Sequence, residues 1–123
     1  MKRPTLYNIL LLFLFFSAFS SSLFAQEYSL RFYDDNNGLS HHQVTRALQD
    51  STGMMWFSTY NGLNRFDGYR FVAFKAANED GLSMPSDRIR RTELTKDNNI
   101  LCLIEDRIVL FNTHTCRFET LPQ

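Results

Sequence analysis

The chain has 123 residues, of which 13 are basic and 13 acidic, so its formal net charge is zero. Proteins that bind nucleic acid rely on clustered cationic side chains that displace counterions from phosphates, and this balance excludes an obvious nucleic-acid partner. A chain of this length can bury a small core, but only if its fold closes on itself.

The first 25 residues have the order of a secretory signal peptide. Lys2 and Arg3 form a short positive segment, Ile9–Phe16 is an unbroken apolar run, and Ser20–Ala25 consists mostly of small residues. This order predicts an exported protein that is cleaved after Ala25. The open alternative is an uncleaved membrane anchor, because Leu6–Phe24 could just span a bilayer.

Segment 26–39 is predicted to hold an isolated strand and a turn. Residues Glu27–Tyr33 alternate between polar and apolar side chains, which is the period of a strand with one buried face. The cluster Asp34–Gly38 contains residues that tolerate left-handed backbone and should end that strand.

Segment 40–75 is predicted to form one β-propeller blade. Four short apolar stretches are separated by turns of two to four residues, which is the pattern of an antiparallel meander. The four expected strands are Gln43–Gln49, Met54–Tyr60, Leu63–Phe66 and Tyr69–Phe74. The residues expected to have structural roles in this blade are Trp56, Gly53, Gly62, Asp67 and Gly68.

A degenerate second blade is predicted at 88–122, after a polar linker at 76–87. Its expected strands are Arg88–Thr95, Ile100–Glu105, Arg107–Asn112 and Cys116–Leu121. Trp56 and Cys102 are 46 residues apart and Phe66 and Phe111 are 45 apart, so the two units align with about one residue of slippage. The predicted fold class is therefore all-β: about two four-stranded antiparallel propeller blades, an incomplete propeller, after a signal helix.

Trp56 lies at the middle of the second expected strand, where it should fill the gap of about 10 Å between stacked blades. The two cysteines invite a disulfide in an oxidising compartment. Cys102 and Cys116 are expected on alternate strands, nearly 10 Å apart, and a disulfide needs Cα atoms within about 7 Å. Two free, mostly buried thiols are therefore predicted.

A family resemblance rests on four segments: Gly38–Ser40, Leu48–Gly53, Trp56–Thr59 and Asn61–Gly68. Together they resemble the two-component regulator propeller repeat, whose blade ends on a motif like W-[IF]-G-T-x-x-G-L-x-R-[YF]-D. Ser58 stands where the family usually has Gly. The resemblance covers residues 27 to about 121 and is faint in the second blade.

The resemblance implies the N-terminal part of a large periplasmic sensor, in which segment 26–39 supplies a strand that closes the ring with the last blade. Such sensors continue into a membrane helix and a histidine kinase, and are associated with carbohydrate sensing. No kinase motif is present in these 123 residues. The implied partners are the remaining propeller blades and an oligosaccharide ligand, and the membrane is reached only through the signal peptide or a downstream part.

Candidate sites for chemistry are weak. Adjacent side chains on an extended strand point to opposite faces, so His41 and His42 are not expected to share a metal ion. Asp34–Gly38 lacks the length and terminal Glu of a calcium loop. Nothing aims Glu93, Glu105 and Asp106 at one another as paired catalytic carboxylates. The sequence therefore predicts no catalytic residues, no cofactor and no metal.

Arg88 and Arg90 are the remaining ligand-binding candidates. At strand spacing they share a face, and they could line a ligand mouth and meet an acidic sugar, although an ion-paired blade rim is the plainer interpretation. The function predicted is a non-catalytic ligand-sensing module. The alternative is an independent small secreted β-protein that self-assembles into a ring and binds a ligand or partner.

Overall fold

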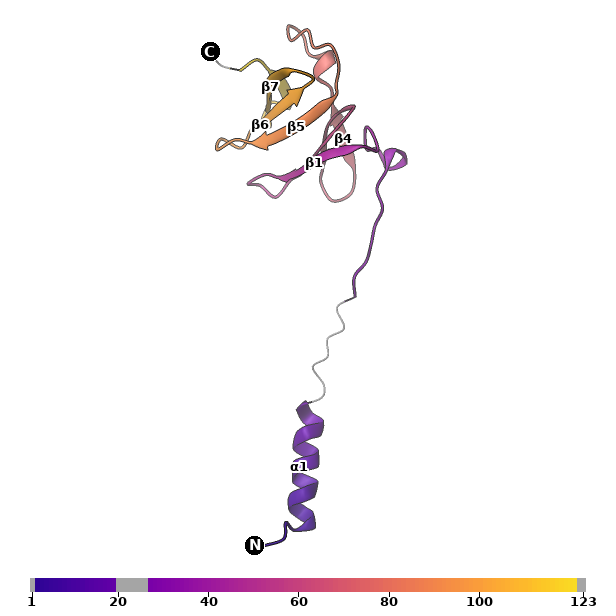
Figure 1. The fold of residues 1–123 in the computed structure, drawn as a ribbon, viewed down its shortest axis with the longest axis vertical. Coiled ribbons are helices and arrows are strands. Elements are labelled where there is room, and N and C mark those ends of the chain that lie inside the picture. The colour runs from indigo at the N-terminus through magenta and orange to yellow at the C-terminus, as the bar shows by residue number, and fades with distance from the viewer. Residues whose placement is uncertain (1, 20–26, 122–123) are drawn as a thin grey trace. The chain divides into compact units, whose positions relative to one another are not determined.

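A computed structural model describes residues 2–19 and 27–121 of the chain. The chain divides into two units, Met1–Arg31 and Phe32–Gln123, each of which is described by itself. In the first unit, α1 spans Leu6–Phe19 (Figure 1), and its sequence places apolar residues on all sides of the helix. No helix within residues 2–19 and 27–121 combines the length and the apolar character needed to cross a membrane. The predicted cleavage site after Ala25 lies outside the described residues.

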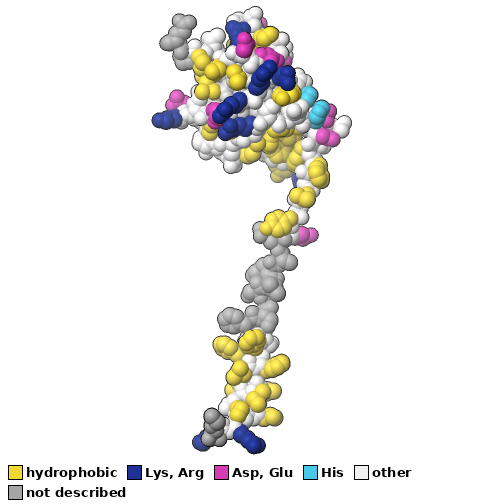
Figure 2. All heavy atoms as spheres, in the orientation of Figure 1, with side chains coloured by type: hydrophobic (Ala, Val, Ile, Leu, Met, Phe, Trp, Pro, Cys, Tyr) yellow, Lys and Arg dark blue, Asp and Glu magenta, His cyan; other side chains and the backbone are white. Residues whose placement is uncertain are grey.

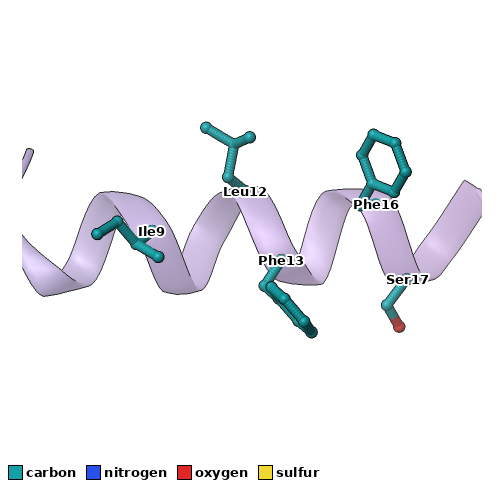
Figure 3. A pocket seen from close by; sticks show the side chains of 5 residues that line it. All are labelled: Ile9, Leu12, Phe13, Phe16 and Ser17. Atoms are coloured by element: carbon teal, nitrogen blue, oxygen red, sulfur yellow. The ribbon is translucent and has the colours of Figure 1, made fainter.

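A hollow lies beside α1. Figure 3 shows the side chains that line it: Ile9, Leu12, Phe13, Phe16 and Ser17. All of them come from one helix, so the hollow is a groove on a helix surface and no second element encloses it. It is therefore not a binding site built by the fold.

The strand predicted at Glu27–Tyr33, which would pair with the last blade of a full ring, stays a prediction: in this structure residues 27–34 have no helix or strand. A strand needs a hydrogen-bonded neighbour, and no described strand pairs with this segment. The turn predicted after it is present as η2, Asp35–Asn37. The Asp34 side chain accepts a hydrogen bond from the backbone of Asn36, and Gly38 follows with a φ of 94°.

The second unit contains two antiparallel four-stranded sheets. The first has strands β1 (Val44–Gln49), β2 (Met55–Thr59), β3 (Gly62–Phe66) and β4 (Phe71–Phe74) in chain order. A linker containing η3 (Ala76–Asn78) leads to the second sheet. Its strands are β5 (Ile89–Leu94), β6 (Ile100–Ile104), β7 (Arg107–Asn112) and β8 (Arg117–Glu119), again in chain order (Figure 1).

The two sheets repeat one another in hydrogen-bond register. Arg46 pairs with Ser58 in the first sheet, and Arg91 pairs with Leu103 in the second, 45 residues later at both positions. Each inner strand also skips one residue at the same place, just before the arginine. Equivalent positions of the two sheets are therefore 45 residues apart from the first strand of each sheet to the third.

This register corrects one predicted equivalence. Trp56 pairs with Arg65 across β2 and β3, and the corresponding pair in the second sheet is Leu101 with Leu110. Trp56 therefore corresponds to Leu101 and not to Cys102. A shift of two residues, and not the predicted shift of one, occurs at the last hairpin, where Phe66 pairs with Phe71 but Phe111 pairs with Phe118.

The core lies between the two sheets. Trp56 is 2% exposed, and its ring packs edge-on against Phe111 of β7, with 5.3 Å between ring centroids. Phe74 joins both rings, and Phe111 also stacks edge-on with Phe118. Residues Ile100, Cys102 and Ile104 are fully buried in the same cluster, so β6 turns this face toward the first sheet.

Both cysteines are free, as the strand argument predicted. Cys102 lies on β6, Cys116 lies just before β8, and β7 is paired between those two strands. Cys102 is buried and Cys116 is half-buried.

Candidate functional site

The inner strands β1 and β5 meet along a polar seam, which is the candidate functional region (Figure 1). The Thr45 hydroxyl donates to the backbone carbonyl of Ile89 over 3.1 Å. The hydroxyls of Ser58 and Thr92 lie 3.2 Å apart and both residues are buried. Ser58 stands where the propeller-repeat motif usually has glycine, and it therefore supplies a hydrogen bond between the sheets.

Charged side chains continue the seam at the surface. Glu93 Oε1 accepts from Arg46 Nη1 of the first sheet at 2.9 Å and from Arg91 Nη2 of its own strand at 3.1 Å. One carboxylate oxygen therefore serves two guanidinium groups. Figure 2 shows Lys and Arg side chains gathered on the face of the folded unit that is turned to the viewer.

The two predicted ligand-binding arginines occupy different environments. The Arg88 guanidinium lies over the ring of Tyr60, 4.2 Å from its centroid, and Arg90 pairs with Glu105 Oε2 at 2.9 Å. Arg88 precedes β5 and Arg90 is the residue skipped in the ladder, so the regular strand alternation on which the prediction of a shared face rested does not apply to them. Both side chains are exposed.

Glu105 lies in the turn between β6 and β7 and is held on two sides. Its carboxylate accepts hydrogen bonds from Arg90 and from the Ser86 hydroxyl. These bonds, Arg90 first, keep the pKa of Glu105 below its ordinary value. A carboxylate held ionised by a permanent cation is a structural anchor for the loop and is poorly suited to act as a general acid.

A buried turn fixes the central tryptophan. Asp50 Oδ2 accepts from the Trp56 indole Nε1 at 2.8 Å, and Oδ1 accepts from the backbone of Thr52 and Met54 and from the Thr52 hydroxyl. Burial raises the pKa of Asp50, but the hydrogen bonds from Thr52, Trp56 and Met54 together outweigh it, so the pKa lies below the ordinary value.

A second polar network ties the segment before β1 to the sheet. The amide of Asn64 accepts from the backbone N–H of Ser40 at 2.9 Å and donates to its hydroxyl at 2.7 Å. The Ser40 hydroxyl also lies 2.9 Å from that of Thr59. Asn64 and Thr59 are fully buried, and their hydrogen bonds satisfy them there.

Sequence reasoning did not recognise this network, although a signal for it is present. Gly-Leu-Ser occurs twice, at 38–40 and at 81–83. In both copies the glycine has a positive φ and the leucine is buried. The repeated tripeptide therefore marks the entry into each sheet.

The turn glycines predicted as structural differ in their surroundings. A Cβ on Gly62, whose φ is 115°, would lie 2.6 Å from the backbone oxygen of Phe74. A Cβ on Gly68 or Gly53 meets nothing closer than 3.9 Å, although both have a positive φ. Asp67 accepts hydrogen bonds from the backbone of Tyr69 and Arg70, which delays the start of β4 to Phe71.

The histidine pair is arranged differently from the prediction. His41 and His42 lie before β1 and not on an extended strand, and their rings stack with 4.3 Å between centroids. Within the described part of the chain, no group of three His, Cys, Asp or Glu side chains is placed to hold a metal ion. Glu93 is engaged by arginines on the inner strands, as described above, while Glu105 and Asp106 lie in the β6–β7 turn.

Comparison with known proteins supplies the family. Residues 38–61 match the two-component regulator propeller repeat. Residues 38–61 therefore carry one copy of this propeller repeat. The matched residues begin at the Gly38 turn and end at Asn61, so they include Ser40, the Asp50–Trp56 pair and the first hairpin, while Asn64, the hydrogen-bond partner of Ser40, lies three residues beyond them.

This chain spans only a small part of two similar proteins. A protein named histidine kinase P4, from Formosa agariphila, is 33% identical over 86 residues, which are 68% of this chain and 6% of that protein. The solved extracellular domain of a protein assigned to the hybrid two-component systems of B. thetaiotaomicron superposes with a TM-score of 0.62 at 26% identity. It covers 76% of this chain, which spans 13% of that structure. The chain thus corresponds to part of a sensor domain of two-component systems.

Proposed function

We propose that this chain is the N-terminal part of a non-catalytic, ligand-sensing propeller in an exported two-component sensor that responds to a carbohydrate. The observation that carries the proposal is the 45-residue register repeat between two sheets packed along their inner strands. A propeller is built by adding such sheets around an axis. The small share of each relative that the chain spans supports a longer ring.

The outer face of the second sheet supports the same proposal. Ile108 is 55% exposed, and Leu101 and Leu103 beside it are half-buried around a small apolar hollow of about 190 Å³. By the register, Leu101 lies where Trp56 packs against the following sheet. A third blade would cover this face in the same way.

Export is proposed from the N-terminal segment. An apolar helix of 14 residues follows Lys2 and Arg3, which is the length of a signal-peptide core. The extracellular location of the solved neighbour agrees with this assignment. Mass spectrometry of the mature N-terminus tests the cleavage: a chain that begins after Ala25 is the expected result, and one that retains Leu6–Phe19 would indicate the uncleaved anchor instead.

Carbohydrate response is tested with the protein as its gene encodes it. A panel of oligosaccharides is compared with peptides and nucleosides by thermal denaturation, because a ligand that binds only the folded state raises the Tm. One saccharide class should raise the Tm. A rise with another class of molecule and none with any saccharide would contradict the proposal.

The part of Arg88 and Arg90 in that response is a separate question. Reversing the charge with Arg90→Glu breaks the pair with Glu105 and repels an acidic ligand. Loss of the Tm rise supports a ligand contact, and an unchanged rise assigns Arg90 to the blade rim. Arg117→Glu, which breaks the pair with Glu79, is the matched control.

A self-assembling ring is the second candidate, and the two apolar outer faces favour it. Each outer face carries two half-buried apolar side chains that point away from the shared core. They are Met55 and Phe57 on the first sheet, and Leu101 and Leu103 on the second. Copies of the chain could cover them by head-to-tail contact. Size-exclusion chromatography with light scattering separates the candidates, since a ring of copies elutes as one defined oligomer.

A further inference from the structure

Equivalent positions of the two inner strands carry arginine. Arg46 and Arg91 are 45 residues apart, and each directly follows the residue skipped in its ladder. Their guanidinium groups converge on Glu93, with N–O distances of 2.9 Å and 3.1 Å. In a propeller the first strand of each blade is the one nearest the axis, so this pair lies where a central channel is lined.

Positive charge exceeds negative charge at this edge. Two guanidinium groups share one oxygen of Glu93, and Glu105 is engaged by Arg90. The nearby Arg88 lies over the Tyr60 ring and has no carboxylate within 4 Å among the described residues. The group of four arginines and two glutamates therefore keeps two uncompensated positive charges.

We infer that Arg46 and Arg91 form an anion-binding site at the inner edge of the blade pair, with Glu93 as a built-in competitor that an anionic group of the ligand displaces. This inference rests on the proposed function and specifies the ligand as a saccharide that carries a carboxylate or a sulfate ester. Arginine presents a planar set of N–H donors that matches the oxygens of either group.

The exposure of these side chains permits such an exchange. The side chains of Arg46 and Glu93 are 41% and 45% exposed, and that of Arg91 is 68% exposed. Arg91 and Glu93 border the same outer hollow as Leu101 and Leu103, so in a ring with a third blade the anion would approach them from the inner edge of the sheet. An ion pair at such exposure is held weakly, because water and salt screen it. The ligand anion therefore has to replace only a weak contact.

The experiment measures binding of three probes to the protein as its gene encodes it: sodium sulfate, a glucuronic acid-containing disaccharide, and the neutral disaccharide with glucose in place of the uronic acid. Isothermal titration calorimetry at low and at physiological salt gives the dissociation constants. Variants Arg91→Gln, Arg46→Gln and Glu93→Gln are compared with Arg70→Gln, at an exposed arginine that pairs with Asp67 in the turn between β3 and β4. The Tm of each variant checks its fold.

The inference predicts that the acidic disaccharide binds more tightly than the neutral one. Arg91→Gln should weaken that binding about tenfold, and Glu93→Gln should tighten it because both guanidinium groups are released. Arg70→Gln should leave it unchanged. A merely structural ion pair would instead give weaker or equal binding in Glu93→Gln.

Sulfate binding without uronate binding would assign the site to sulfate esters, and uronate binding without sulfate binding to carboxylates; either result supports the inference. Equal affinity for the two disaccharides in every variant would overturn it while leaving a carbohydrate sensor intact. Failure of all three probes to bind the unmodified protein would overturn it as well, and the wider saccharide panel would then decide the proposed function separately.

Discussion

Trp56 Nε1 donates a hydrogen bond of 2.8 Å to Asp50 Oδ2, and the second blade lacks both partners. The equivalent positions, 45 residues later, are Leu101 and Thr95. Thr95 keeps one part of the role of Asp50, because its hydroxyl accepts from the backbone N–H of Asn99 as Asp50 accepts from that of Met54. The acid and the indole have therefore been replaced together, which indicates that they form one unit.

Breaking this unit should destabilise the first blade. Trp56→Phe removes the hydrogen bond to the carboxylate of Asp50, which is 7% exposed, and reduces the contact area with Phe111. We therefore expect a loss of about 3 kcal/mol in the free energy of unfolding. Urea unfolding measures this loss. It is followed by circular dichroism, because Trp56 is the single tryptophan and the variant therefore has no tryptophan fluorescence.

A double-mutant cycle with Asp50→Ala isolates the pair. The coupling energy between Trp56→Phe and Asp50→Ala should be at least about 1 kcal/mol. Tyr69→Phe, at a residue that is 90% exposed, is the control and should change stability little. Strictly additive losses would contradict the account.

Acid should weaken the fold through Asp50. Its folded-state pKa is held below the ordinary value of 3.8, so the folded state favours the ionised carboxylate. The resulting stabilisation is complete above the ordinary pKa and is lost as the pH falls through the lower folded-state pKa. Asp50→Asn should therefore show a shallower loss of stability below about pH 4 than the unmodified protein. The unfolding midpoints of both proteins are measured at about six pH values between about 2.5 and 6. If Asp50 did not contribute to the acid sensitivity, the two curves of midpoint against pH would run parallel.

Two glycines should respond differently to the same substitution. Gly62→Ala places a methyl group 2.6 Å from the Phe74 carbonyl at a positive φ, and we expect a loss of at least about 3 kcal/mol. Gly68→Ala has the positive φ but an open environment, so its loss should be about 1 to 2 kcal/mol. Equal losses by urea titration would show that the close approach at Gly62 does not matter.

The two thiols should react at different rates. Burial raises the pKa of Cys102 to about 12, and a thiol that stays protonated is a poor nucleophile. Cys116 is half-buried and should be alkylated by iodoacetamide at least about tenfold faster in the folded protein. Mass spectrometry of Cys102→Ser and Cys116→Ser assigns the rates, and urea should equalise them. Faster labelling of Cys102 in native buffer would contradict the assigned burial.

Much of the fold could be predicted because the blade is built from local signals. The alternation of apolar residues and the turns at Gly53 and Asn61 located all eight strands of the two sheets within two residues. The strand at Glu27–Tyr33 could not be verified by its own pattern, because pairing depends on a neighbour far along the chain. The Trp56–Cys102 equivalence failed because the expected strands were aligned by their sequence pattern and not by hydrogen-bond register.

The candidate site was harder to predict than the fold. Arg88 and Arg90 were found as a cluster in the sequence, but the arginine pair with a shared partner is Arg46 and Arg91. Their relationship appears only when the two inner strands are aligned by their skipped residues. A bulge shifts the faces of all residues that follow it, and the amino-acid pattern alone did not reveal it.

The central claim is that these two sheets are consecutive blades of a larger propeller ring, and reading the natural coding sequence beyond the codon for Gln123 tests it most directly. The account predicts further repeats of about 45 residues, the first of which supplies apolar side chains to cover Leu101 and Ile108. A stop codon at that point, together with a folded monomer that leaves Leu101 and Ile108 uncovered, would contradict it.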